Sequence, residues 1–164
     1  MNLTSRRGNM VLEAALWIPI TTLLLVGMAQ IGRVTYTYYT LRKTVYSIAQ
    51  YVSSQQAVDF CNPADPAIAA AINFGLTGTT DNTGTALVNG LTSDMILVAA
   101  ETFDSATQTL SSWSSASCVD GAGGAVPQFI TVSIPEGYGI SIRIPRVPLT
   151  PILLKPVAKV PYGG

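Results

Sequence analysis

The chain has 164 residues, enough for one small domain with an appendage, and its formal net charge is zero. Charged residues make up only 11% of it, against about 25% in an ordinary soluble domain. There is no histidine, and no run of basic residues is longer than a pair such as Arg6 and Arg7, so the commonest general base and the electrostatic signature of nucleic-acid binding are both missing. Uncharged polar residues take the place of the missing charges, which suits a protein whose faces meet other proteins or a membrane.

The first element is a long apolar segment. Between Gly8 and Gly32 the only charged residue is Glu13. As a helix this stretch would span about 37 Å, more than the hydrocarbon core of about 30 Å. Two arginines precede it, so the positive-inside rule places the N-terminus in the cytoplasm and exports the rest. The sequence therefore predicts a transmembrane-grade helix over residues 9–32.

The helical pattern continues past the apolar segment. From Val34 to Val52 apolar residues recur at spacings of three and four, which is typical of an amphipathic helix. We therefore predict one long N-terminal helix over residues 9–54. Pro19 lies inside it, and we expect a kink there instead of an end, because neighbouring groups in a membrane can satisfy the freed carbonyl.

Two other interpretations of the apolar segment remain open. A signal peptide would share its basic and apolar regions, with a small-x-small cleavage site ending at Ala29. A plain single-pass anchor is the second. Neither explains Glu13, because a carboxylate in hydrocarbon costs about 2.5–3.5 kcal/mol and usually marks a functional site with a partner. A position of Glu13 at the membrane interface would also account for it.

Residues 55–164 are predicted to form a small β-rich head, which makes the fold class α+β. Asp65 and Pro66 suit the cap and first turn of a short helix, and Gly75 suits its end. The apolar run over residues 94–103 favours a strand.

The last part of the head contains the clearest strand signal. Apolar and polar residues alternate over residues 130–134 and again over 140–144, with a Pro-Glu-Gly-Tyr-Gly turn between them. This pattern predicts an antiparallel hairpin whose apolar face covers the outer half of the long helix. Five prolines follow between Pro145 and Pro161, which exclude a helix or a central strand. We expect an extended arm, lying along its own domain or across a neighbouring subunit.

The sequence offers little chemistry. Cys61 and Cys118 lie far apart, without metal-binding spacing; they predict one disulfide if the head is exported, and two buried free thiols otherwise. The segment around Asp81 and Asn82 lacks the ligand spacing of a calcium loop. With no nucleophile–base pair and no phosphate-binding glycine loop in the sequence, we expect no enzyme, no cofactor and no metal.

The opening "RRGNMVLE" and the apolar helix after it resemble the processing site of type IV pilin-like proteins. The continuation to Val52 is similar to the TadE-like pilins and pseudopilins of tight-adherence pilus systems. In those proteins a membrane peptidase cuts after the glycine, and a glutamate is the fifth residue of the mature chain. The resemblance implies a leader of residues 1–8, a cut between Gly8 and Asn9, and Glu13 as that glutamate.

The resemblance also implies a function. Glu13 would pair with the free N-terminal amine of a neighbouring subunit and set the axial register. The chain would then be a structural subunit that polymerises through its hydrophobic helix into an extracellular filament for adhesion. Its partners would be copies of itself, prepilin peptidase, the pilus assembly machinery and, before assembly, the inner membrane. A minor pseudopilin that initiates or caps the fibre is one alternative; a membrane-anchored extracytoplasmic binding module is the other.

Overall fold

The computed structural model of the chain describes residues 4–62, 64–113, 126–142 and 150–163, with side chains from Met10 onward. The fold is α+β, with one long N-terminal helix and a small antiparallel sheet, as the sequence predicts. In chain order the elements are α1 (Thr4–Ser53), α2 (Pro66–Thr77), the short 3-10 helix η1 (Ser93–Met95), β1 (Leu97–Asp104), β2 (Thr109–Ser112), β3 (Phe129–Ser133), β4 (Tyr138–Ile140), β5 (Ile152–Leu154) and β6 (Val157–Pro161).

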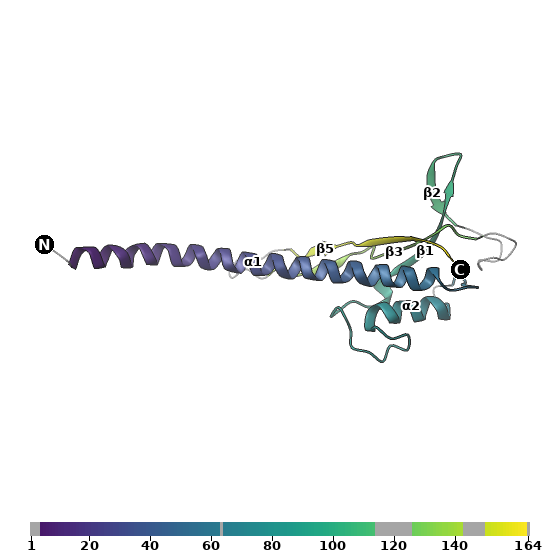
Figure 1. Cartoon of the computed structure of the whole chain (residues 1–164), viewed down its shortest axis with the longest axis horizontal. Helices are drawn as coiled ribbons and strands as arrows, with labels where there is room; N and C mark the ends of the chain where they lie inside the picture. Colours follow the sequence, from purple (N-terminus) through teal and green to yellow (C-terminus); the bar gives the residue numbers. More distant parts are fainter. Residues whose placement is uncertain (1–3, 63, 114–125, 143–149, 164) are drawn as a thin grey trace.

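Helix α1 determines the shape of the molecule. Its 50 residues correspond to a rod of about 75 Å, and only the C-terminal part of this rod lies within the head (Figure 1). The helix begins at Thr4, earlier than predicted, because Gly8 lowers helix stability by only about 1 kcal/mol and does not end a helix. One face of its C-terminal half is fully buried in the head. That face consists of Leu41, Val45, Ile48, Ala49 and Val52.

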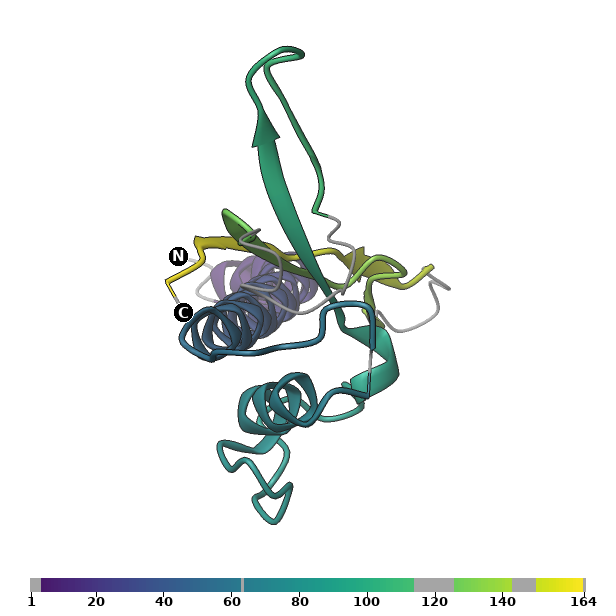
Figure 2. The ribbon, with the colours of Figure 1, turned by 90° about the vertical axis from the view of Figure 1, so that its right-hand side faces the viewer.

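The head packs around this buried face. Figure 2 shows α1 end-on, with the sheet on one side of it and α2 on the other. The four-stranded sheet has the order β2-β1-β3-β6, and its neighbouring strands are antiparallel. Ile130 and Val132 of β3 and Val160 of β6 enter the same core as the buried face of α1. As predicted, the apolar face of residues 130–134 covers the outer half of the long helix.

The predicted hairpin between residues 130–134 and 140–144 is wrong. Strand β3 pairs with β1 and β6, whereas β4 pairs with β5. The Pro135–Gly137 segment does not reverse the chain. Ile134 before it pairs with Pro156, and Tyr138 after it pairs with Leu154. The three residues from Pro135 to Gly137 therefore face a single residue, Lys155, on the segment that contains β5 and β6. This is a bulge, so both predicted strands lie on one side of a longer hairpin, and β5 and β6 form its other side.

The proline-rich tail lies along its own domain. Its strand β6 is an edge strand of the four-stranded sheet, in agreement with the rule that proline avoids central strands. Pro156 immediately precedes β6, and Pro161 is its last residue.

Helix α2 begins as predicted and ends later. The Asp65 carboxylate accepts hydrogen bonds from the backbone N–H groups of Ala67 and Ile68, and Pro66 opens the helix. Gly75 does not end it. It is buried inside α2 against Ile48 and Thr44 of α1, while Gly78 adopts the left-handed C-cap conformation with φ 80°. Gly75 therefore serves the close approach of two helices.

We expect Gly75→Ala to destabilise the head by about 1–3 kcal/mol, the usual effect of overpacking. An added Cβ would overlap the Ile48 side chain and lie 3.3 Å from the carbonyl oxygen of Thr44. The measurement is denaturant unfolding of the detergent-solubilised chain, followed by near-UV circular dichroism. Gly27→Ala is the matched control, because a Cβ there meets nothing within 4 Å. Equal unfolding midpoints for the two variants would contradict the packing of α2 on α1.

Candidate functional site: the exposed stem of α1

The N-terminal half of α1 has many exposed apolar side chains, which the packing of the head does not explain. We call residues 10–39 of α1 the stem. By length and composition, α1 is the one described helix able to cross a membrane. The exposed large apolar side chains between Met10 and Ile31 of the stem are between 46% and 74% accessible. They are Met10, Val11, Leu12, Leu16, Trp17, Ile18, Ile20, Leu23, Leu24, Leu25, Met28 and Ile31.

An apolar surface of this extent marks a membrane or protein contact, since soluble monomers rarely expose such patches. The stem is continuous with the helix that forms the head core, so its orientation relative to the head is set by that core. The stem can therefore anchor the chain in a membrane. Any contact it makes with other proteins would also fix the direction in which the head points.

Threonine hydroxyls in the apolar part of the stem form hydrogen bonds within the helix. The Thr21 hydroxyl donates to the carbonyl oxygen of Trp17 at 3.0 Å, and the Thr22 hydroxyl donates to that of Ile18 at 2.7 Å. Such bonds to the preceding turn remove the need for water at a buried hydroxyl. The helix continues through Pro19, so that residue does not end it; the kink expected there stays a prediction.

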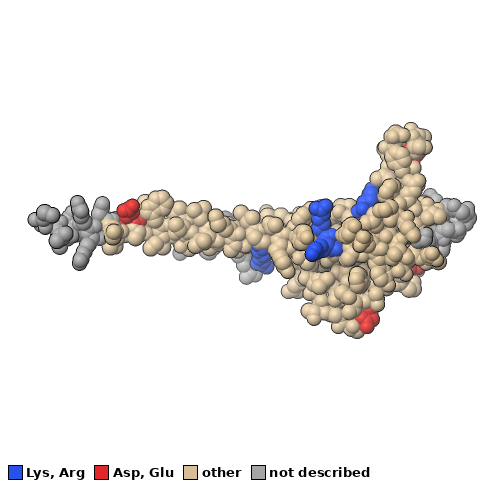
Figure 3. All heavy atoms as spheres, in the orientation of Figure 1, with Lys and Arg blue, Asp and Glu red and all other residues tan. Residues whose placement is uncertain are grey.

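The stem has one charged residue near each end. Glu13 is exposed, and Arg33 lines a cavity where the stem meets the head. Figure 3 shows acidic atoms near the free end of the stem and basic atoms closer to the head. Twenty residues of helix separate them by about 30 Å, which matches the hydrocarbon core of a bilayer. A stem perpendicular to the membrane would therefore place both charges at the interfaces. This geometry agrees with the interfacial position considered for Glu13 and makes the stem compatible with insertion.

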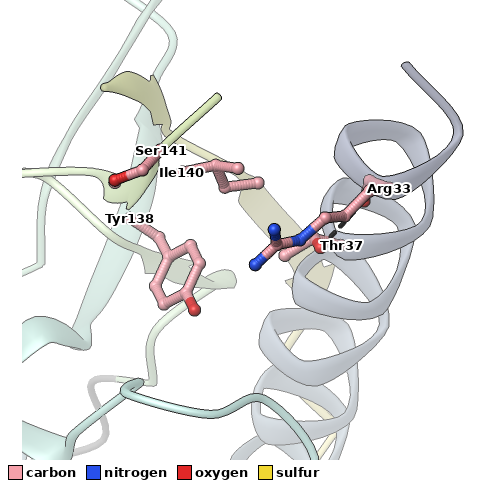
Figure 4. A pocket seen from close by; sticks show the side chains of 6 residues that line it. Arg33, Thr37, Tyr138, Ile140 and Ser141 are labelled. Atoms are coloured by element: carbon pink, nitrogen blue, oxygen red, sulfur yellow. Dashed lines mark hydrogen bonds between the residues drawn. The ribbon is translucent and has the colours of Figure 1, made fainter. Parts of the chain in front are cut away.

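Arg33 extends from α1 over a cavity of about 360 Å³ at the junction of stem and head. Figure 4 shows its guanidinium directed toward Tyr138 and Ile140, at strand β4. The Tyr138 hydroxyl donates to the carbonyl oxygen of Asn89 at 2.5 Å, which ties β4 to the loop that follows α2. The cavity is therefore lined on one side by the Arg33 cation and on the other by Tyr138, which its hydrogen bond to Asn89 holds in place. Arg33 lies next to the apolar stem, where a long basic side chain can reach the membrane interface.

A second hollow, of about 340 Å³, lies beside α1 further into the head. We call it the α1–β6 groove. Its lining residues are Tyr39, Arg42, Lys43, Tyr46, Val157, Ala158 and Lys159. The Lys43 ammonium lies 4.9 Å from the centroid of the Tyr39 ring, and Lys159 forms an ion pair with Glu101. The groove therefore combines three cations with two aromatic rings. The sequence analysis missed it because its two sides are more than 110 residues apart in the chain.

The other predicted site residues are placed as follows. Gly8 and Asn9 lie within the first turns of α1. Cys118 lies outside the described residues, so the disulfide with Cys61 stays a prediction. The Asp81 carboxylate accepts hydrogen bonds from the backbone N–H and the hydroxyl of Thr83, and these bonds lower its pKa. Asp81 thus shapes a turn.

Comparison of the chain with protein-family models, with curated proteins and with solved structures finds no match.

We expect Leu24→Lys to weaken membrane retention, because a lysine near the middle of the stem costs about 2.5–3.5 kcal/mol in a bilayer. The measurement is the fraction of chain that resists alkaline extraction from membranes. Leu87→Lys is the matched control: Leu24 and Leu87 are 59% and 57% exposed, but Leu87 lies in the head. Equal retention of the two variants would show that the stem does not enter the bilayer.

Proposed function

We propose that the chain is a pilin-like structural subunit of the TadE-like type, which polymerises through the stem of α1 into an extracellular filament that serves adhesion. The observation that carries this proposal is the exposed apolar stem, which continues without a break into the helix at the centre of the head. A tether for a binding module needs only an anchor. A polymerising subunit also needs every head to be held at a defined angle to the filament core, and a single helix meets that need.

The proposed route begins in the inner membrane. The stem has the length and composition to span it, with the head exported. Prepilin peptidase then cuts between Gly8 and Asn9, which removes Arg6 and Arg7 and frees an amine. The stem next leaves lipid for a core of identical stems, delivered by the pilus assembly machinery. Hydrocarbon surrounds it before and after this step, so the transfer is driven mainly by packing and by polar pairing.

Glu13 supplies the polar pairing in this proposal. At the membrane interface its carboxylate keeps contact with water, but inside a filament core it is surrounded by other stems. A buried carboxylate is tolerated only when it is paired and hydrogen-bonded. The free amine of a neighbouring subunit is the partner proposed for Glu13, and this pair would select one axial register among the many that apolar stems allow.

The head is proposed to act outside the cytoplasm, where the Cys61–Cys118 disulfide would form. In the chain-entropy model, a cross-link over so long a loop stabilises a domain by about 4 kcal/mol. That gain would help a head whose core depends largely on one face of α1. No catalytic role is proposed for it.

We expect Glu13→Leu to abolish filaments while the chain is still expressed and inserted. Loss of one partner of a buried ion pair costs about 3–5 kcal/mol, whereas leucine is favourable in a bilayer. The measurement is the amount of chain in the sheared, sedimentable surface fraction relative to the membrane fraction. Glu136→Leu, which removes an exposed carboxylate from the head, is the control and should assemble normally. Normal filaments from Glu13→Leu cells would contradict the role of Glu13 in setting the axial register.

We also expect the sedimentable chain to begin at Asn9 and to carry no free thiol. Intact mass and N-terminal sequencing of sheared material, alkylated without reductant, measure both properties at once. A chain that begins at Met1 and occurs only in membranes would contradict processing and assembly. Alkylation of both cysteines in exported protein would contradict the disulfide alone.

A further inference from the structure

The hairpin of β1 and β2 stands apart from the rest of the head. Figures 1 and 2 show it projecting away from the body of the molecule. The two strands pair from Glu101↔Ser112 to Asp104↔Thr109, and every residue of β2 is exposed. An isolated two-stranded hairpin is at best marginally stable in water. We call residues 101–112 the arm. Contact with a partner surface would stabilise it.

The arm carries an apolar pair near its tip. Phe103 and Leu110 lie directly opposite each other in the register of β1 and β2, and each is 42% exposed. Directly opposed side chains pack as a unit in an antiparallel pair. The arm therefore presents a small preformed apolar patch at some distance from the core of its own chain.

The two edges of the four-stranded sheet differ in their protection. The edges are β2 and β6. Strand β6 contains Lys159, ends in Pro161 and follows Pro156, all of which discourage pairing with another strand. Strand β2 has the sequence Thr-Leu-Ser-Ser, without charge or proline. Residues that discourage strand pairing are therefore present on the β6 edge and absent from β2, so the β2 edge is the one better able to accept a partner.

The arm and the α1–β6 groove have complementary chemistry. Asp104 ends β1 at the tip of the arm, and the N–H of Ala106 and the hydroxyl of Thr107 lower the pKa of its carboxyl group. The groove contains Arg42, Lys43 and Lys159. Among the described residues, Lys159 has an ion-pair partner, Glu101, whereas no ion pair is formed by Arg42 or Lys43. Tyr39 and Tyr46 are 58% and 48% exposed, so aromatic surface is available for Phe103 beside the cations.

We propose that the arm of one copy docks in the α1–β6 groove of a second copy, with the face that carries Phe103 and Leu110 against the tyrosines. Asp104 belongs to the opposite face of the arm, but its carboxylate bends over the turn toward Ala106 and Thr107 and would meet Arg42 and Lys43 from the tip. Glu101 at the base of the arm contacts Lys159 of its own groove, but the outer part of the arm projects away from its own head. Arm and groove are different surfaces, so the contact is heterologous and can repeat from copy to copy, as a filament requires. The inference rests on the proposed filament function and names a head-to-head contact that would add to the packing of stems.

The test is cross-linking between two differently tagged full-length chains in the same cells. One chain carries Leu110→Cys on the arm, and the other carries Val157→Cys in the groove. The control replaces Val157→Cys by Leu87→Cys; these positions are 58% and 57% exposed, but Leu87 lies outside the groove. With a short bifunctional thiol reagent we expect the arm–groove pair to give at least about tenfold more mixed-tag product than the control pair, a difference equivalent to about 1.4 kcal/mol.

Asp104→Asn tests the charge component without removing the acceptor for the Ala106 N–H. We expect this variant to lower the cross-linking yield severalfold and to remove most of its dependence on salt, because exposed ion pairs are screened by salt. An unchanged yield and salt dependence would overturn the Asp104 contact with Arg42 and Lys43.

The outcomes separate the two proposals. Sedimentable filaments without enrichment of the Leu110–Val157 product would overturn the arm contact and leave the filament function standing. Enriched product confined to membranes, without filaments from the parent chain, would support the contact and overturn the function. Absence of both filaments and enriched product would overturn both.

Discussion

The structure depends on one constraint: a single helix forms the core of the head with its C-terminal part and exposes apolar side chains along its N-terminal part. From Leu41 to Val52 one face of α1 is fully buried in the head, while the stem before it keeps its apolar side chains accessible around the helix. The junction contains no linker. The head therefore does not fold independently of the helix, and the stem does not reorient independently of the head. This coupling distinguishes the molecule from a domain on a flexible tether.

The rest of the head follows from the need to cover that buried face. The sheet covers one side of α1 through β3 and β6, and α2 covers the other. Gly75 brings α2 close enough for Ile48 to fill the space that a side chain would take. A core of this kind leaves the β1–β2 hairpin with no helix to cover it, which is why the arm is the most exposed part of the sheet.

The few charges are placed at boundaries. Glu13 and Arg33 stand near the two ends of the apolar stem, about one hydrocarbon thickness apart. Arg42 and Lys43 lie one to two helical turns beyond Tyr36, Tyr38 and Tyr39 of the stem, and in the fold they line the same groove as Lys159. In a chain so poor in charge, each of these groups has few local competitors. A carboxylate from a second copy would therefore meet a well-defined set of partners.

The sequence by itself determined the elements whose signal is local. The apolar helix over residues 9–32, the cap of α2 by Asp65 and a strand within residues 94–103, whose start is the helix η1 in the structure, all follow from patterns within about twenty residues. Helix periodicity, capping and hydrophobic length act over that range. Only the tertiary structure decided which strand pairs with which. Alternation at residues 130–134 shows a buried face but not a partner, so β6 and the bulge at Pro135–Gly137 were not foreseen. The same holds for Gly75, whose role is set by the approach of another helix, and for the α1–β6 groove, whose two walls meet only when the chain has folded.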